Sequence, residues 1–169
     1  LRDALGRAWQ MATIQLDFQM PERFDLTYEG NDNKKHRVVM IHRAIFGSFE
    51  RFIGILTEQF AGKFPLWISP TQAIILTLSE KNLNYAKKVE TMLRDNDIRV
   101  IIDDRSETIS KKVRDAQLQK INYMVTVGDK EQQKNTLAIR TIDGKVKFDV
   151  EINKFINELL KEISNKDVR

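Results

Sequence analysis

The sequence of 169 residues contains no cysteine. Nothing therefore indicates disulfide bonds or a secreted scaffold that depends on them. Its longest apolar runs are far too short to cross a bilayer, and no signal peptide opens it. We therefore expect a cytoplasmic protein.

Proline is scarce, with three residues in the whole sequence. Two of them, Pro65 and Pro70, bracket a short segment that contains Trp67. Prolines stiffen a connection and end a preceding helix. We therefore predict a domain boundary here, with residues 1–64 in one domain and residues 65–169 in the next, and Trp67 as a packing anchor.

The charge is only mildly basic, at +4 with a pI of about 9.3. This balance is compatible with an anionic partner, although many soluble proteins carry as much. Hydrophobic residues make up 41% and charged residues 31% of the sequence, which is typical of a globular protein. A chain of this length can bury one sizeable core or two modest ones.

The stretch from residue 38 to residue 60 is largely apolar and also contains residues that could take part in binding or catalysis. Its first four residues, Val38–Ile41, form a β-branched run that predicts a strand buried on both faces. Gly47 and Ser48 interrupt the apolar pattern. From Ser48 onward the three- and four-residue spacing predicts an amphipathic helix with one apolar stripe, formed by Phe49, Phe52, Ile53, Leu56 and Phe60.

Two polar residues of this stretch have open interpretations. Arg51 falls between Gly47 and Gly54 on the side opposite the stripe, where space around its guanidinium suits a planar or phosphorylated ligand. It could equally be a solvated surface charge. His42, at a strand end, is either a metal ligand or a structural histidine with satisfied hydrogen bonds.

Polar and apolar residues alternate from Thr13 to Phe18, which predicts a strand. Its polar side chains, Thr13, Gln15 and Asp17, would then share one face, turned toward a cavity or toward water. The polar segment that follows carries turn-forming residues and predicts a hairpin-like connection to the next strand.

The second half alternates between predicted strands and helices, which indicates an α/β domain with a mainly parallel sheet. We predict a mixed sheet of five strands with three helices, so that the chain is α+β overall. The predicted strands are residues 73–78, 98–102, 123–127, 137–141 and 146–148, and the predicted helices are residues 82–96, 108–120 and 150–163.

Basic and polar residues follow these strands closely. Arg105 and Ser106 come after the second strand, and the string GDKE, with Glu131, comes after the third. We expect them at the carboxyl edge of the sheet, where open α/β folds bind ligands. A solvated helix face is the alternative. The whole predicted ring consists of Arg105, Ser106, Lys111, Lys112, Arg114, Lys120, Lys130, Glu131 and Arg140.

The string HRAIFGSFERFIGILTEQFAGKFPLWISPTQ resembles the last signature motif of the class II aminoacyl-tRNA synthetases, in particular the threonyl branch, and the start of its anticodon-binding domain. The Gly-Ser-x-Glu-Arg step carries the class II likeness, and AWQMATIQLDF, GDKE and AIR extend it over nearly the whole chain. The resemblance implies that residues 1–64 are the end of an antiparallel aminoacylation domain and that residues 65–169 bind the anticodon.

The family likeness implies roles for the first domain. Gln10, Thr13 and Arg51 match positions that contact ATP with Mg²⁺, and Arg51 is the implied catalytic residue, offsetting phosphate charge. Gln15 matches a position in the amino-acid pocket. His42 matches another there and is one of three protein ligands of a zinc ion, which distinguishes threonine from valine by its hydroxyl group.

The resemblance also implies anticodon contacts in the second domain. Arg140 with Glu131 could read the guanine edge of a threonine anticodon. Ser106 stands where the family has asparagine, Asn122 replaces a proline, and Ile142 with Asp143 replaces a basic pair. The implied contact residues are Arg105, Ser106, Arg114, Lys120, Glu131 and Arg140.

From this likeness we expect the C-terminal piece of a longer, homodimeric enzyme that joins threonine to tRNA(Thr) with ATP. We expect the piece alone to be metal-free and inactive. The alternatives are a non-catalytic accessory module that binds RNA or DNA, and a folding or dimer-forming segment without a ligand. An accessory module would have no use for the set Gln10, Thr13, His42 and Arg51.

Overall fold

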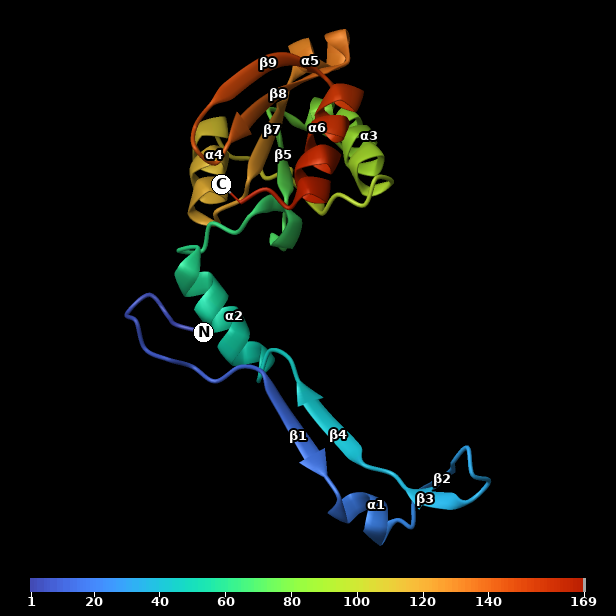
Figure 1. Ribbon diagram of the computed structural model, residues 1–169. Helices are drawn as coiled ribbons and strands as arrows, with labels where there is room; N and C mark the ends of the chain where they lie inside the picture. The colour runs from blue at the N-terminus through green and yellow to red at the C-terminus, as the bar shows by residue number, and fades with distance from the viewer. Residues whose placement is uncertain (169) are drawn as a thin grey trace. The chain divides into compact units, whose positions relative to one another are not determined.

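The computed structural model describes residues 1–168, and the chain divides into two compact units, Leu1–Ala61 and Gly62–Arg169. Each unit has its own secondary structure and is described by itself below (Figure 1). The predicted domain boundary, between residues 64 and 65, lies close to this division. Among the described residues, no helix is long and apolar enough to cross a membrane.

The first unit is built on two antiparallel strands, β1 and β4, joined by a smaller hairpin. The strand predicted from the alternation at Thr13 is confirmed. The predicted hairpin-like connection is confirmed too, although it also contains a short helix. The elements are β1 (Thr13–Asp17), α1 (Gln19–Arg23), β2 (Thr27–Glu29), β3 (Lys35–Arg37) and β4 (Met40–Ala44), with β1 paired to β4 and β2 paired to β3.

The prediction of a buried strand at Val38–Ile41 is wrong in position and in burial. The strand begins at Met40, and none of its residues is buried, with Ile41 at 63% exposure. Its partner β1 is equally open, since Ile14 is 67% and Leu16 is 60% exposed. An apolar run is buried only where another layer packs on it, and within the described residues β1 and β4 contact mainly each other.

The predicted helix after Ser48 is confirmed as α2 (Phe49–Gln59). The Ser48 hydroxyl accepts a hydrogen bond from the backbone N–H of Arg51 at 3.2 Å, which caps the helix. The prediction that Pro65 ends this helix is wrong. The backbone turns left-handed at Ala61, with φ of 49°, and this conformation stops the helical hydrogen bonding before any proline is reached.

The second unit contains the predicted mixed sheet of five strands, in the order β6-β5-β7-β8-β9. The three strands β6, β5 and β7 are parallel, as predicted, whereas β8 and β9 add antiparallel pairings at one side. A short turn joins β8 to β9, and a turn of that length returns the chain antiparallel. The strands are β5 (Ala73–Thr77), β6 (Val100–Asp103), β7 (Tyr123–Val127), β8 (Thr136–Thr141) and β9 (Val146–Glu151).

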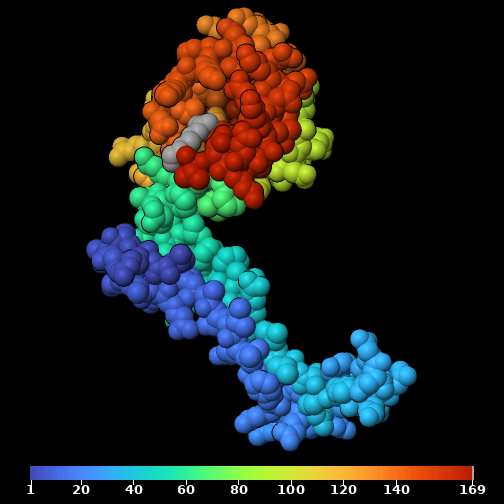
Figure 2. All heavy atoms as spheres, in the orientation of Figure 1, coloured from blue at the N-terminus to red at the C-terminus, as the bar shows by residue number. Residues whose placement is uncertain are grey.

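The three predicted helices are confirmed, and they cover the two faces of the sheet unequally. Helices α3 (Leu83–Arg94) and α6 (Ile152–Asn165) pack on one face and α4 (Ile109–Leu118) on the other (Figure 1). The surfaces of β9 and α6 meet in the space-filling view (Figure 2). A fourth helix, α5 (Asp129–Lys134), was not predicted because its six residues have no apolar stripe.

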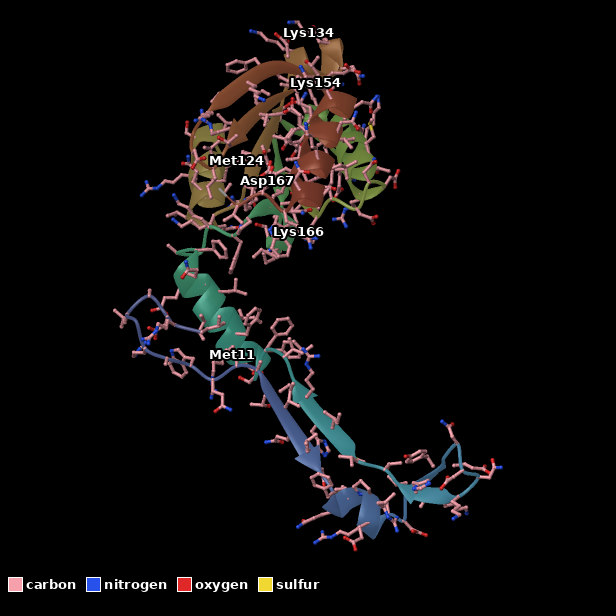
Figure 3. The ribbon with its side chains drawn as sticks, viewed as in Figure 1. Met11, Met124, Lys134, Lys154, Lys166 and Asp167 are labelled. Atoms are coloured by element: carbon pink, nitrogen blue, oxygen red, sulfur yellow. The ribbon has the colours of Figure 1, made fainter. Side chains whose placement is uncertain are left out.

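Alternating side chains of β5 point into two separate cores. Ile75 belongs to the larger core beneath α3 and α6, with Phe155 from α6. Ile74 belongs to the smaller core beneath α4, together with Met124 of β7 (Figure 3). The smaller core ends at β7, so the same face of β8 and β9 is left open, and Phe148 there is 72% exposed.

The prediction that Lys112 belongs to an exposed basic ring is wrong, because the lysine is only 2% exposed. Its ammonium group donates hydrogen bonds to the backbone oxygens of Thr77 at 2.8 Å and Asp103 at 3.1 Å. These are the last residues of β5 and β6. Lys112 therefore ties α4 to the carboxyl ends of two parallel strands.

We predict that Lys112→Met lowers the free energy of unfolding by about 1–3 kcal/mol, because two buried carbonyl groups lose a charged donor. Methionine has a similar shape, so packing is largely kept. Urea unfolding measures the effect. The neighbouring exposed residue provides the control, and Lys111→Met should change the stability by no more than about 0.5 kcal/mol. Equal effects of the two substitutions would contradict this role.

Candidate functional site

A groove of about 770 Å³ opens in the second unit where the carboxyl ends of β5 and β7 meet the uncovered face of β8 and β9. The chain leaves β5 through α3 on one face of the sheet and leaves the adjacent strand β6 through α4 on the other face. Such a point in a sheet creates a crevice suited to ligands. The groove is lined by residues that include Leu78, Ser79, Asn82, Val113, Thr126, Glu131, Arg140 and Phe148.

A buried amide joins the two strand ends at this groove. Asn82, which is 1% exposed, follows β5 and donates to Asp129 Oδ1 at 2.8 Å and to Gln132 Oε1 at 3.2 Å. Its own oxygen accepts a hydrogen bond from the Ser79 hydroxyl at 2.9 Å. Because Asp129 and Gln132 lie on α5, Asn82 fixes the start of that helix against the end of β5.

Glu131 is held in place by its own helix. Its Oε2 accepts a hydrogen bond at 3.0 Å from the backbone N–H of Gly128, the residue that caps α5. A Cβ atom at Gly128 would lie 3.0 Å from Leu78 Cδ2, so a glycine at this position lets the backbone lie close to the Leu78 side chain. The result is a carboxylate anchored by one oxygen at the groove wall, which can accept hydrogen bonds from a ligand through the other.

Arg140 lines the same groove from β8, opposite Met124 of β7. Its Nη1 makes one long hydrogen bond of 3.5 Å to the backbone oxygen of Gly144. A guanidinium carries five donor hydrogens in a planar fork. Arg140 and Glu131 thus offer donors and an acceptor to one ligand in one groove.

Arg105 and Ser106 line a second cavity, of about 360 Å³, next to the groove. Arg105 donates to Asp103 Oδ2 at 2.7 Å and to Asp115 Oδ2 at 2.9 Å. Its guanidinium lowers the pKa of Asp103, and the two carboxylates raise the pKa of Arg105. These two ion pairs hold Arg105 in the β6–α4 loop, and its side chain remains 51% exposed.

The remaining predicted anticodon residues are not gathered with this set. Lys120 lies just beyond the end of α4, in a left-handed conformation with φ of 59°, and therefore at the amino edge of the sheet. Arg114 is exposed on α4 and lines neither of the two cavities. Fewer residues than predicted therefore lie at the carboxyl edge of the sheet. The predicted residues of α4 point in different directions around the helix, and the helix runs from one edge of the sheet to the other.

The polar residues predicted to share a face of β1 do so. Gln15 lies directly opposite His42 in the β1–β4 pairing, and strand alternation places Thr13 and Asp17 on the same side. His42 Nε2 lies 3.0 Å from Asp17 Oδ2. Hydrogen bonds from the backbone N–H of Met20 and from His42 lower the pKa of Asp17.

These residues alone do not complete a zinc site. A catalytic zinc ion takes three protein ligands. Within the part of the chain that the structure describes, no group of three or more His, Cys, Asp or Glu side chains is placed to hold a metal. His42 and Asp17 could supply at most part of such a site.

Arg51 is positioned by the segment before β1. Its guanidinium carbon lies 5.5 Å from the centre of the Trp9 ring, and its Nη1 donates to the backbone oxygen of Gln10 at 3.4 Å. Trp9 is fixed in turn, since its indole N–H donates to Asp3 Oδ2 at 2.8 Å. Hydrogen bonds from Trp9 and Arg7 lower the pKa of Asp3 to about 2.

Sequence reasoning missed Asn82, Trp9 and Asp3 as site residues. An asparagine at a predicted helix start signals a cap, and only the sheet topology shows that it reaches α5 from β5. The contact from Trp9 to Arg51 spans 42 positions, and no local pattern encodes it.

Two family models match this chain. The model described as anticodon binding domain matches residues 72–162. The model described as tRNA synthetase class II core domain (G, H, P, S and T) matches residues 1–60. The first match includes the whole groove, and the second includes the strands β1 and β4 and the helix α2.

The relatives include threonine–tRNA ligases of bacteria. That of Desulfatibacillum aliphaticivorans is 56% identical over 99% of this chain and 26% of that protein, and that of Thermotoga neapolitana is 54% identical over 98% of this chain and 26% of that protein. The chain therefore spans about a quarter of the length of the curated relatives it matches.

One similar solved structure is the crystal structure of the RNA binding domain of threonyl-tRNA synthetase from Cryptosporidium parvum Iowa II. It is 40% identical in sequence, with a TM-score of 0.81, over 95% of this chain and 41% of that chain. The similarity covers the mixed five-stranded sheet and its helices.

We predict that Asn82→Ala lowers the free energy of unfolding by about 1–3 kcal/mol, since Asp129 and Gln132 lose a buried donor. Hydrogen exchange should speed up at the backbone N–H groups of Gly128 and Glu131. The exposed Asn84, on α3, provides the matched control through Asn84→Ala. Exchange that is as slow in Asn82→Ala as in this control would show that the amide does not hold α5.

The Asp3 carboxylate should release Trp9 only in strong acid. Its folded pKa is below the ordinary value of 3.8, so its contacts are complete above that pH and are lost as the pH falls through about 2. Trp9 fluorescence, measured in a Trp67→Phe background, should change with a midpoint near pH 2, while circular dichroism follows the fold. Asp3→Asn should abolish the transition, and a midpoint near 3.8 would contradict the assignment.

Proposed function

The chain belongs to the family of anticodon binding domains, and from this premise we propose that it is part of a threonine–tRNA ligase. The longer enzyme would activate threonine with ATP and transfer it to tRNA(Thr). In this proposal the second unit binds the anticodon, and the first unit contributes the last class II motif. The observation that carries the proposal is the groove that presents Glu131 and Arg140 together.

The chemistry of the groove supports reading of a guanine. A guanine edge offers acceptors, which suit the Arg140 fork, and N–H donors, which suit the anchored Glu131 carboxylate. A site built only to attract phosphate would not place a carboxylate at its wall. Threonine anticodons carry guanine at their middle position, and we propose that Arg140 and Glu131 bind this base. Ser106 lines the adjoining cavity and is proposed for a neighbouring nucleotide.

We further propose that Arg51, Gln10 and Thr13 contact ATP in the longer enzyme. Adenylation needs positioned charge more than a covalent nucleophile, and the Arg51 guanidinium carbon lies 5.5 Å from the centre of the Trp9 ring, a contact that favours one placement of the charge. Arg51 would offset negative charge on the phosphates as the threonine carboxylate attacks the α-phosphorus.

Gln15 and His42 are proposed to line the threonine pocket, since they lie opposite each other on one face. His42 would be one zinc ligand, with the other ligands supplied from outside these residues. The Asp17 carboxylate supports this role, because an imidazole that donates one N–H to a carboxylate has its other nitrogen fixed as a lone-pair donor. Bound zinc would supply recognition of the substrate amine and hydroxyl.

The test compares binding of two RNA hairpins. One carries the anticodon loop of tRNA(Thr), and in the other the middle guanine of the anticodon is replaced by adenine. We expect the chain to prefer the guanine form. Arg140→Ala should cost about 1–3 kcal/mol of affinity for the guanine hairpin and abolish the preference. Fluorescence anisotropy at fixed salt concentration measures both.

Arg114→Ala is the matched control, because Arg114 is an exposed arginine outside both cavities. It should lower the affinity for the two hairpins equally or not at all. Equal binding of both hairpins by the unmodified chain would refute base reading by this groove. It would favour an accessory module that binds nucleic acid without regard to sequence.

A further inference from the structure

Phe148 is an aromatic side chain that the proposed contacts do not use. It is 72% exposed and lines the groove that also contains Glu131 and Arg140. Burying a phenylalanine is worth about 1.5–3 kcal/mol, so the fold gains little from this side chain where it stands. Because the ring lines the groove beside the polar groups, it is available for stacking to a ligand bound there.

A β-bulge gives Phe148 this direction. The β8–β9 register shifts between Leu137 and Ile139, and Asp149 has a left-handed φ of 52°. Val150, just beyond the bulge, is 9% exposed in the larger core. Without the shift, Phe148 and Val150 would point to the same face, because residues two apart in a regular strand do so. The bulge lets Val150 pack in the core while Phe148 faces the groove.

The open face around Phe148 is small and carries charge at its borders. Its apolar neighbour on β9 is Val146, which is 39% exposed. Together with Leu78, which lines the same groove and is 54% exposed, these side chains still fall far short of the roughly 800 Å² per partner that a stable protein interface buries, so a second copy of the chain is a poor occupant. Lys130 and Arg140 line the groove and suit an anionic ligand that is itself planar.

An unpaired RNA base fits these requirements. Single-stranded loops are bound by stacking of splayed bases on aromatic rings, with nearby cations holding the phosphates. We propose that Phe148 is a stacking platform for a base of the anticodon loop, next to the base that Glu131 and Arg140 contact. This inference deepens the proposed function and rests on the same groove.

The experiment measures binding of the tRNA(Thr) anticodon hairpin to the 169-residue chain carrying Phe148→Ala, Phe148→Leu or Phe148→Trp. Loss of one stacked base costs about 1–3 kcal/mol, so Phe148→Ala should weaken binding by about 5- to 150-fold. Phe148→Leu should also weaken it, because leucine keeps apolar area but has no ring. Phe148→Trp should keep the affinity.

Two further measurements make the result specific. The slope of affinity against salt should stay unchanged in Phe148→Ala, whereas Lys130→Ala should reduce it by about 1 if Lys130 contacts a phosphate. Hairpins that each lack one loop base should identify the stacked position. Removal of that base should weaken binding to the unmodified chain but should not weaken binding to the Phe148→Ala variant. Leu118→Ala, at an apolar residue that is 68% exposed outside the groove, should leave binding unchanged.

The outcomes separate this inference from the proposed function. Full affinity in Phe148→Ala, with the guanine preference intact, would overturn the stacking role and leave the proposed function standing. Absence of a guanine preference in the unmodified chain would defeat the proposed function. The affinities of the Phe148→Ala, Phe148→Leu and Phe148→Trp variants would still test the stacking role. If Phe148→Ala changed only the sedimentation behaviour, the ring would be a contact between copies and the inference would fail.

Discussion

The position of β5 between β6 and β7 is the constraint on which the second unit depends. It sends the two crossover helices to opposite faces and opens a crevice at the strand ends. Polar groups at such an edge need partners, and Lys112 supplies them for β5 and β6 while Asn82 supplies them between β5 and α5. The same contacts that close the sheet edge therefore hold the groove in shape.

The antiparallel addition of β8 and β9 converts this crevice into a longer surface. The smaller core stops at β7, because α4 packs mainly on β5. Strand β8 can therefore present Arg140 on a face without a covering helix, while its opposite face packs Leu137 and Ile139 into the larger core. A half-covered sheet of this kind combines a rigid support with an accessible binding face.

Short apolar runs and helical spacing were enough to predict the five strands and three principal helices of the second unit, because strands such as β5 and β7 are buried along nearly their whole length and each of these helices buries one face. They failed for α5, which is short and polar, and for Lys112, whose charge suggests exposure. They also failed for the strand near Met40, since an apolar run does not reveal what will cover it. Pairing of Arg105 with Asp103 and Asp115 depends on how a loop closes, which no local pattern shows.

The first unit shows why residue type alone does not define a site. Arg51 was singled out because neighbouring glycines leave it room, yet its position is set by Trp9 and Asp3, from a segment that precedes β1. A free arginine side chain loses about 2 kcal/mol of rotamer entropy when a ligand fixes it. The contact of Arg51 with the Trp9 ring removes part of that freedom on folding, so under the proposed function its charge would act on a bound nucleotide with less reorganisation. If Arg51 has the proposed role, Trp9 contributes to it by positioning the guanidinium.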